Sequence, residues 1–295
     1  MNLNEPAASQ FAVYGPTFLD VVMGPLDGPP IPGREAWVEG ALMCAGGAAN
    51  QAIALARLGT PVRLHSRVGV DQMGVFVDEM LAREGVDTSS CERVGDQNVT
   101  VSLSFDGDRA MATRGTTALP RLGGDAPGCL LADVRGISAN SEVVSSWRER
   151  GTWVLADTAW DEAGAWDEAD LEALRLADVC TPNEEEALAY ARTESVEDAA
   201  RWFSSFGCDC VVTCGKNGVI ACVDGQILRV PAPPVDAVDT TGAGDVFSAA
   251  LAWALRARRA SWPEALALAC AAAAHSIQGI GGSASAPYAA DLAGA

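Results

Sequence analysis

Asp239-Thr240-Thr241-Gly242-Ala243-Gly244-Asp245, followed directly by the apolar run Val246–Leu255, is the most informative stretch of this chain. Small residues stand where a loop turns into a helix, and Gly242 and Gly244 allow a ligand close to the backbone. The first turn of a helix has unpaired N–H groups and a partial positive charge, which favour a phosphate. A carboxylate that points into a phosphate pocket costs electrostatic energy unless it has a function there, such as taking a proton from an attacking hydroxyl. The alternative is an ordinary tight turn in which Asp245 caps the helix.

The composition indicates an α/β protein with a sizeable core. The chain has 295 residues, of which 49% are apolar and 20% charged, enough for one large domain or two modest ones. Acidic residues outnumber basic ones by 39 to 20, and the net charge of −19 argues against nucleic acid or an anionic membrane as partner.

The cysteines and the apolar runs indicate the compartment. The nine cysteines lack zinc-site spacing and are interpreted as small buried hydrophobes in a reducing compartment. No signal-peptide pattern and no uninterrupted apolar run of membrane-spanning length is present, so we expect a cytoplasmic location.

Strand-like and helix-like runs alternate along the chain, which favours βαβ units and a mostly parallel sheet. The half-polar hairpin 99–113, with Asp106-Gly107 at its turn, does not fit a buried parallel sheet, and neither does Glu35–Met43. We assign both to a small projecting sheet, a lid, and Pro25–Pro32 to a loop. Helices are predicted over 48–58 and 73–84, and strands over 11–14, 62–68 and 179–181. Further short strands and helices alternate in the second half, over 128–131, 142–150, 153–156, 171–176, 184–191, 196–206, 210–213 and 219–223.

A second glycine-rich segment, Gly46-Gly47-Ala48-Ala49-Asn50, precedes the predicted helix Gln51–Leu58. The two glycines again allow a ligand near the backbone, and the Asn50 amide can both donate to and accept from a hydroxyl. A loop with an Asn cap is the plainer alternative. A dinucleotide-binding fold is a third, but its glycine spacing is absent.

Four segments, in this order, resemble the motifs of the PfkB family of carbohydrate kinases, the ribokinase-like kinases. They are Gly46-Gly47-x-x-Asn50 with Gly59 and Gly69, the NxxE motif at Asn183–Glu186, the TxGxxG loop at Thr213–Gly218, and the C-terminal signature at Asp239–Asp245. The resemblance spans residues 15 to 287. It implies a ribokinase-like α/β fold: one domain over 1–295, with a three-layer Rossmann-like core and a small β-sheet lid from about 31–44 and 91–116.

The resemblance also implies roles for individual residues. Asp245 matches the general base, and the backbone of Gly242, Ala243 and Gly244 matches the anion hole for the transferring phosphoryl group. The sugar contacts correspond to Asp20, near the end of the first strand, and to Gly46, Gly47 and Asn50.

The nucleotide and cation positions follow from the same resemblance. ATP contacts match Thr213, Gly215 and Gly218, together with Asn183. Asn183 and Glu186 match the positions that organise Mg²⁺ through its waters, and Asp239 and Thr241 match positions that hold K⁺ in some members.

One segment departs from the family pattern. Many sugar kinases carry Asp-Pro-Asn-x-Arg where this chain has Asp157-Thr158-Ala159-Trp160-Asp161, so the arginine that helps hold acidic sugars is missing. We therefore expect ATP-dependent phosphorylation of a neutral sugar or related polyol. A nucleoside kinase of the same family is the alternative, and an inactive sugar-binding protein a less favoured one. Family lids sometimes pair into homodimers, which is a further expectation for this chain.

Overall fold

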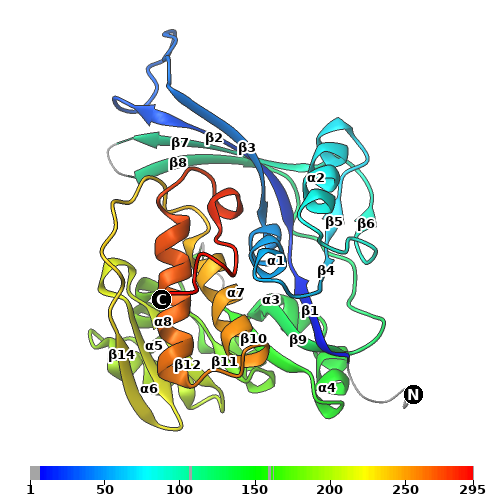
Figure 1. Cartoon of the computed structure of the whole chain (residues 1–295), viewed down its shortest axis with the longest axis vertical. Coiled ribbons are helices and arrows are strands. Elements are labelled where there is room, and N and C mark those ends of the chain that lie inside the picture. The colour runs from blue at the N-terminus through cyan, green and yellow to red at the C-terminus, as the bar shows by residue number, and fades with distance from the viewer. Residues whose placement is uncertain (1–6, 106–107, 159–160, 162, 295) are drawn as a thin grey trace.

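An eight-stranded sheet runs through the centre of the protein, which the computed structural model describes over residues 7–105, 108–158, 161 and 163–294 (Figure 1). The strand order is β14-β13-β12-β11-β10-β9-β1-β4. The six strands from β12 to β4 in this order are parallel to one another, and β13 and β14 pair antiparallel. The expected mostly parallel sheet is thus confirmed. The strands are β1 (Ala7–Tyr14), β4 (Val62–His65), β9 (Pro127–Asp133), β10 (Trp153–Asp157), β11 (Val179–Cys180), β12 (Asp209–Thr213), β13 (Val219–Val223) and β14 (Gln226–Val230).

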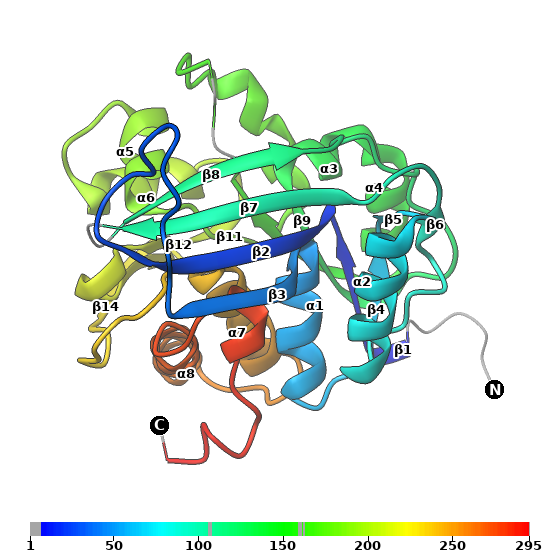
Figure 2. The same cartoon turned by 90° about the horizontal axis from the view of Figure 1, so that it is seen from above.

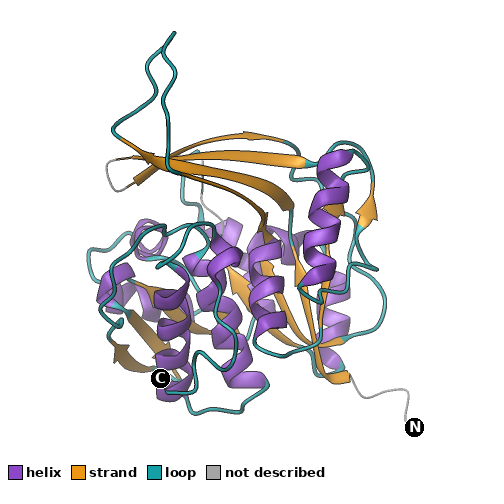
Figure 3. Cartoon of the chain, turned by 45° about the horizontal axis from the view of Figure 1, so that its top comes forward, coloured by secondary structure: helices purple, strands orange, loops and turns teal. Residues whose placement is uncertain are grey.

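Helices cover both faces of this sheet (Figure 3). Because successive strand residues point to opposite faces, the core divides in two. Val13 and Leu131 pack in one cluster, and Ala12 and Leu130 in the other. The first cluster involves α1 (Ala48–Arg57), α2 (Gln72–Arg83), α7 (Ala243–Arg256) and α8 (Trp262–Ser276); the second involves α3 (Val134–Ala139), α4 (Ser141–Glu149), the 3₁₀ helix η1 (Glu168–Leu176), α5 (Glu184–Ala191) and α6 (Val196–Ser204).

A second sheet of four strands, the lid, lies across one end of this core (Figure 2). The chain enters it after β1 ends at Tyr14, so the lid covers the carboxyl ends of the parallel strands. Ligands of open α/β sheets bind at this end. In spatial order, the lid strands are β3 (Gly40–Gly47), β2 (Thr17–Leu26), β7 (Asn98–Phe105) and β8 (Asp108–Arg114).

The lid differs from the sequence expectation in two of its strands. The predicted loop Pro25–Pro32 is wrong at its start, because β2 continues through Pro25 to Leu26. The predicted strand Glu35–Met43 is displaced: β3 begins at Gly40 and runs to Gly47, while residues 27–39 form a loop that extends beyond the sheet (Figure 3). Gly46 and Gly47 looked like a loop because glycine weakens strands. The hairpin β7–β8 was predicted correctly, and its turn lies outside the described residues.

Smaller elements also depart from prediction. Helix α3 and strand β14 were not expected. The single strand 62–68 is divided at Ser66, whose hydroxyl donates to Gly15 O at 2.6 Å; β4 ends before it, and β5 (Arg67–Val68) pairs instead with β6 (Glu92–Arg93). All nine cysteines are buried as free thiols, as interpreted from the sequence. Within the described residues, none of the helices has the length and apolarity needed to cross a bilayer.

Candidate active site

The site forms around the N-terminus of α7. Gly242, the N-cap residue, has φ +70°, a left-handed conformation that favours glycine. A Cβ at this position would lie 2.9 Å from Gly282 Cα and 3.1 Å from Asn50 Nδ2. Ala243 N–H donates a long bond of 3.3 Å to Thr240 O, which closes the turn. Asp245 then falls in the first helical turn, where the helix dipole favours a negative charge.

The carboxylate of Asp245 receives hydrogen bonds at both oxygens from the first turns of α1. Asn50 Nδ2 donates to Oδ2 at 3.0 Å, and Gln51 Nε2 donates to Oδ1 at 3.2 Å. Burial raises the pKa of Asp245 to about 6, and the two amides oppose this rise because they bond to the charged form. Asp245 is thus an acid tuned to lose its proton just below neutral pH.

Asp20 lies opposite this site on the lid. It stands in the middle of β2, so its expected place near the end of the first strand is wrong. A Cβ on Gly46 would be 1.8 Å from Asp20 Oδ2, so the carboxylate lies directly against the bare backbone of Gly46. Burial, followed by the charges of Asp245 and Asp239, raises the pKa of Asp20 to about 6. Asp20 and Asp245 are therefore close enough for each to oppose ionisation of the other.

The loop before α7 is fixed by Asp239. Its Oδ1 accepts from Thr241 N at 2.9 Å and from Thr241 Oγ1 at 2.7 Å, and its Oδ2 accepts from Gly281 N at 2.8 Å. The neighbouring 3₁₀ helix η3 (Gly282–Ser285) is held to α1 as well, because Ser283 N donates to Asn50 Oδ1 at 3.0 Å. These bonds bring together residues that are far apart in the sequence.

A cavity of about 580 Å³ opens beside the same helix end. The predicted nucleotide residues Thr213, Gly215 and Gly218 line it, and so do Ala243 and Gly244. One end is therefore polar backbone at a helix N-terminus, which suits phosphates. The remaining wall is largely apolar, which suits a flat aromatic base; it includes Pro233, Val235, Phe247 and Ile277.

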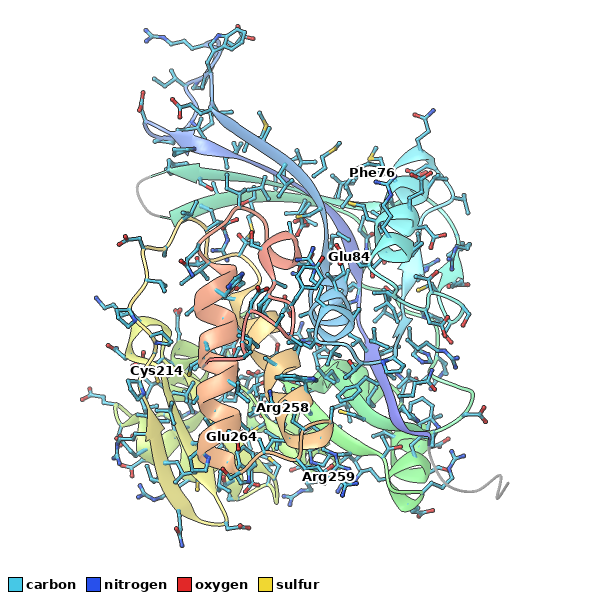
Figure 4. All side chains as sticks on the ribbon, in the orientation of Figure 1. Phe76, Glu84, Cys214, Arg258, Arg259 and Glu264 are labelled. Atoms are coloured by element: carbon cyan, nitrogen blue, oxygen red, sulfur yellow. The ribbon has the colours of Figure 1, made fainter. Side chains whose placement is uncertain are left out.

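Gly218, which lines the cavity, lies so close to the end of β14 that no side chain fits at this position. The residue has φ +88°, and a Cβ there would lie 2.1 Å from Val230 O. Lys216, the single lysine of the whole chain, also lines the cavity. Cys214, between β12 and this loop, is buried and marks its position in Figure 4.

A further pair of predicted residues lies at the start of α5. Asn183 and Glu186 form a capping box: Glu186 N donates to Asn183 Oδ1 at 2.9 Å, and Asn183 N donates to Glu186 Oε2 at 3.1 Å. Thr158 Oγ1 also donates to Glu186 Oε2 at 2.6 Å. Burial raises the pKa of Glu186. Burial, with the charges of Glu186 and Asp245, holds the pKa of Asp157 well above its usual range.

The sequence interpretation missed three residues that contact this region. Gln51 was hidden by its neighbour Asn50, although both stand in the first turns of one helix. Asp157 was noticed only as part of an altered motif. Arg109, which belongs to none of the four motifs, donates from the lid to Thr240 Oγ1 at 3.1 Å. Only the pairing of β8 with β7 brings Arg109 to this place, and no local pattern could predict that contact.

The chain is similar in sequence to known proteins. A profile of the pfkB family carbohydrate kinases matches residues 39–116 and 137–289. The chain belongs to this family. A fructokinase of Klebsiella pneumoniae is 35% identical over 236 residues, covering 71% of this chain and 76% of that protein. An aminoimidazole riboside kinase of Salmonella typhimurium is 29% identical over 253 residues, covering 76% of this chain and 77% of that protein.

Solved structures of pfkB kinases agree with the fold. The ribokinase of Arabidopsis thaliana, determined with ribose and ATP, superposes with a TM-score of 0.79 at 25% identity and covers 98% of both chains. The ribokinase-like fold expected from the motifs is thus confirmed. The chain is accordingly a carbohydrate kinase, a phosphotransferase that uses ATP.

Proposed function

We propose that the chain transfers the terminal phosphoryl group of ATP to a hydroxyl of a neutral sugar or related polyol, with Asp245 as general base. One observation carries the proposal: the Asp245 carboxylate lies at the same helix end whose residues Ala243 and Gly244 line the nucleotide cavity. The base and the phosphate site are therefore adjacent.

The reaction follows from this placement. Asp245 takes the proton of the sugar hydroxyl as its oxygen forms a bond to the terminal phosphorus. The bond from that phosphorus to the bridging oxygen breaks, and ADP leaves. Backbone N–H groups of Gly242, Ala243 and Gly244 face the charge on the transferring group. Phosphoryl transfer depends mainly on such positioning and charge stabilisation.

The sugar site is proposed on the inner face of the lid, at Asp20, Gly46, Gly47 and Asn50. A carboxylate accepts hydroxyl hydrogens in strong, charge-assisted bonds. Asp20 lies close enough to Asp245 and Asp239 that their negative charges, after burial, help to raise its pKa. This supports a neutral substrate over a sugar acid.

Mg²⁺ is proposed near Asn183 and Glu186. The side chains fit, because oxygen ligands suit this ion and Asn183 Oδ1 already caps α5, which leaves contact through water. A cation here relieves the mutual repulsion of Asp157 and Glu186. When bound with the nucleotide, it neutralises phosphate charge. K⁺ is proposed beside Asp239 and Thr241, on the loop that Gly281 fixes.

Two alternatives remain tied to particular observations. A nucleoside kinase is favoured by the likeness to the aminoimidazole riboside kinase. A sugar-binding protein without activity is disfavoured, because Asp245 retains both amide partners and Glu186 retains its capping box.

We further propose a homodimer through the outer face of the lid. Two neighbouring cross-strand rows of this face contain only apolar side chains, while Asp20, Leu42 and Cys44 face inward. The helix α2 packs against β2 and β3, and Val21 is partly buried against the core. Large exposed apolar patches mark interaction sites. One row consists of Ala41, Met23, Leu103 and Ala110. The other consists of Met43, Val21, Val101 and Ala112.

The test is an ADP-release assay across pentoses, hexoses, sugar acids and nucleosides with Mg²⁺, with and without K⁺. We expect a neutral sugar to give the highest kcat/KM. In the variant Asp245→Asn, kcat should fall by roughly 10²- to 10⁴-fold, since a positioned base contributes that much, while ATP and sugar still bind by calorimetry. Near-normal turnover of Asp245→Asn refutes the role of base. A nucleoside as best substrate selects the alternative kinase.

A further inference from the structure

Gln51 is a residue to which none of the four sequence motifs gives a role. It follows Asn50 in the first turns of α1, is 7% exposed, and reaches Asp245 across 194 residues of sequence. The helix begins at Gly47, whose φ is +63° and whose Cβ would lie 2.3 Å from Pro16 O, so the start of α1 is fixed tightly to the chain entering the lid.

The two amides that bond to Asp245 differ in their freedom. Asn50 has a partner at each end of its amide, because its Oδ1 accepts from Ser283 N at 3.0 Å while its Nδ2 donates to Asp245. Asn50 is also assigned to the sugar. The side chain of Gln51, in contrast, is described with one hydrogen bond, the one it donates to Asp245.

We propose that Gln51 is a positioning residue for phosphoryl transfer, which holds Oδ1 of Asp245 and keeps the carboxylate ionised and correctly oriented toward the sugar hydroxyl. The proposal rests on the proposed role of Asp245 as general base.

Two physical effects support this role. An amide donor stabilises the charged form of a carboxylate, and a general base works only when it is ionised. Fixing both oxygens also fixes the side-chain rotamer, and small displacements of a reacting group are costly.

The surroundings make this donor important. Two carboxylates lie near Asp245: Asp20, on β2 of the lid, and Asp157, on β10. The charge of Asp245 contributes to the raised pKa of both. Arg109, on β8, reaches Thr240 in the loop before α7. Within the described part of the chain, Asn50 and Gln51 are the two side chains that donate hydrogen bonds to Asp245.

The experiment compares pH profiles of kcat/KM between pH 5 and 9, with D-fructose or D-ribose, whichever gives the higher rate. Wild type should show an acidic limb near pH 6, the pKa of Asp245. Gln51→Met keeps the length of the side chain but removes the donor. It should move this limb up by about one pH unit, since a hydrogen bond to a charged group is worth that much. Its rate should then be about five-fold lower at pH 6 and about two-fold lower at pH 7, with recovery toward pH 9.

A second variant and a control keep the test decisive. Gln51→Asn stays polar but is one methylene too short, so it should shift the limb in the same direction even if Gln51→Met folds poorly. Gln97→Met removes another buried glutamine, which bonds to Thr17 O and Gly69 N at the base of the lid. It should lower thermal stability but leave the limb in place.

The outcomes separate the two proposals. If both Gln51 variants lower kcat/KM equally at every pH, or only lower the melting temperature, Gln51 is merely structural and the inference is overturned. If Asp245→Asn keeps its turnover, the proposed function itself fails, whatever Gln51 does.

Discussion

Asp245 is placed in an environment that its own charge disfavours. Burial raises its pKa to about 6, while Asn50 and Gln51 oppose the rise. A folded-state pKa above the ordinary value of 3.8 means that the folded protein holds this proton more tightly than the unfolded chain. The stability from Asp245 is therefore fully present below about pH 4 and is lost as the pH rises through 6. Function at neutral pH is obtained at the expense of stability.

This sign leads to a prediction for the ligand-free protein. Asp245→Asn cannot ionise, so its free energy of unfolding relative to wild type should increase from pH 4.5 to pH 8, by about 2 kcal/mol. Urea denaturation at the two pH values measures the difference. Asp20→Asn should change in the same direction, because its pKa is raised by the same cause. A difference that stays constant with pH, or shrinks as the pH rises, contradicts this account.

At the scale of elements, β3 determines where the Asp20 carboxylate lies. Gly46 has no side chain, and Asp20 of the neighbouring strand fills that space. The glycine pair was recognised in the sequence as a place of close approach, but the ligand was expected to be the sugar. In the structure the closest group is the Asp20 carboxylate itself. The register between β2 and β3 determines which side chain lies against Gly46, and the sequence of one segment does not specify that register.

Gly46→Ala should therefore displace Asp20. We expect the KM for the sugar to rise about 10- to 100-fold, the equivalent of one charge-assisted hydrogen bond, with the KM for ATP unchanged. Steady-state kinetics with each substrate varied in turn measures this. A double-mutant cycle with Asp20→Ala is the control, since the added methyl has no carboxylate to displace there. Strictly additive effects of the two changes would argue that Gly46 acts through something other than Asp20.

The parts of the site differ in how far the sequence predicted them. The N-terminus of α7 was predicted in detail, because glycines, an acid and an apolar helix are contiguous between Asp239 and Leu255. The start of α5 was predicted for the same reason, with Asn183 and Glu186 in one turn. The contacts of Gln51 and Arg109 were not, because each joins segments more than 100 residues apart. Strand β2 was missed because its polar Asp20 and its Gly24-Pro25 break the usual alternation.

For the whole molecule, the apolar outer face of the lid is the feature that the sequence could not reveal. Its residues belong to four strands and gather only when β3, β2, β7 and β8 pair. We predict that Met43→Glu, at a side chain 50% exposed in the isolated chain, converts a dimer to a monomer with little change in the stability of the fold. Size-exclusion chromatography with light scattering measures this.

The matched control for that prediction is Ala257→Glu. Ala257 is also exposed, but it lies at the end of α7 away from the lid, beside Arg258 and Arg259 (Figure 4). This variant should remain dimeric. A wild-type protein that is monomeric at tens of micromolar removes the proposed interface.

Strand β3 passes directly into helix α1, since Gly47 is both the last residue of the strand and the N-cap of the helix. No loop separates the sheet proposed to bind the sugar from the helical turns that contain Asn50 and Gln51. A tilt of the sheet must therefore rotate those two amides relative to Asp245. We expect sugar binding, by tilting this sheet, to change the geometry of both hydrogen bonds and with it the acidity of Asp245.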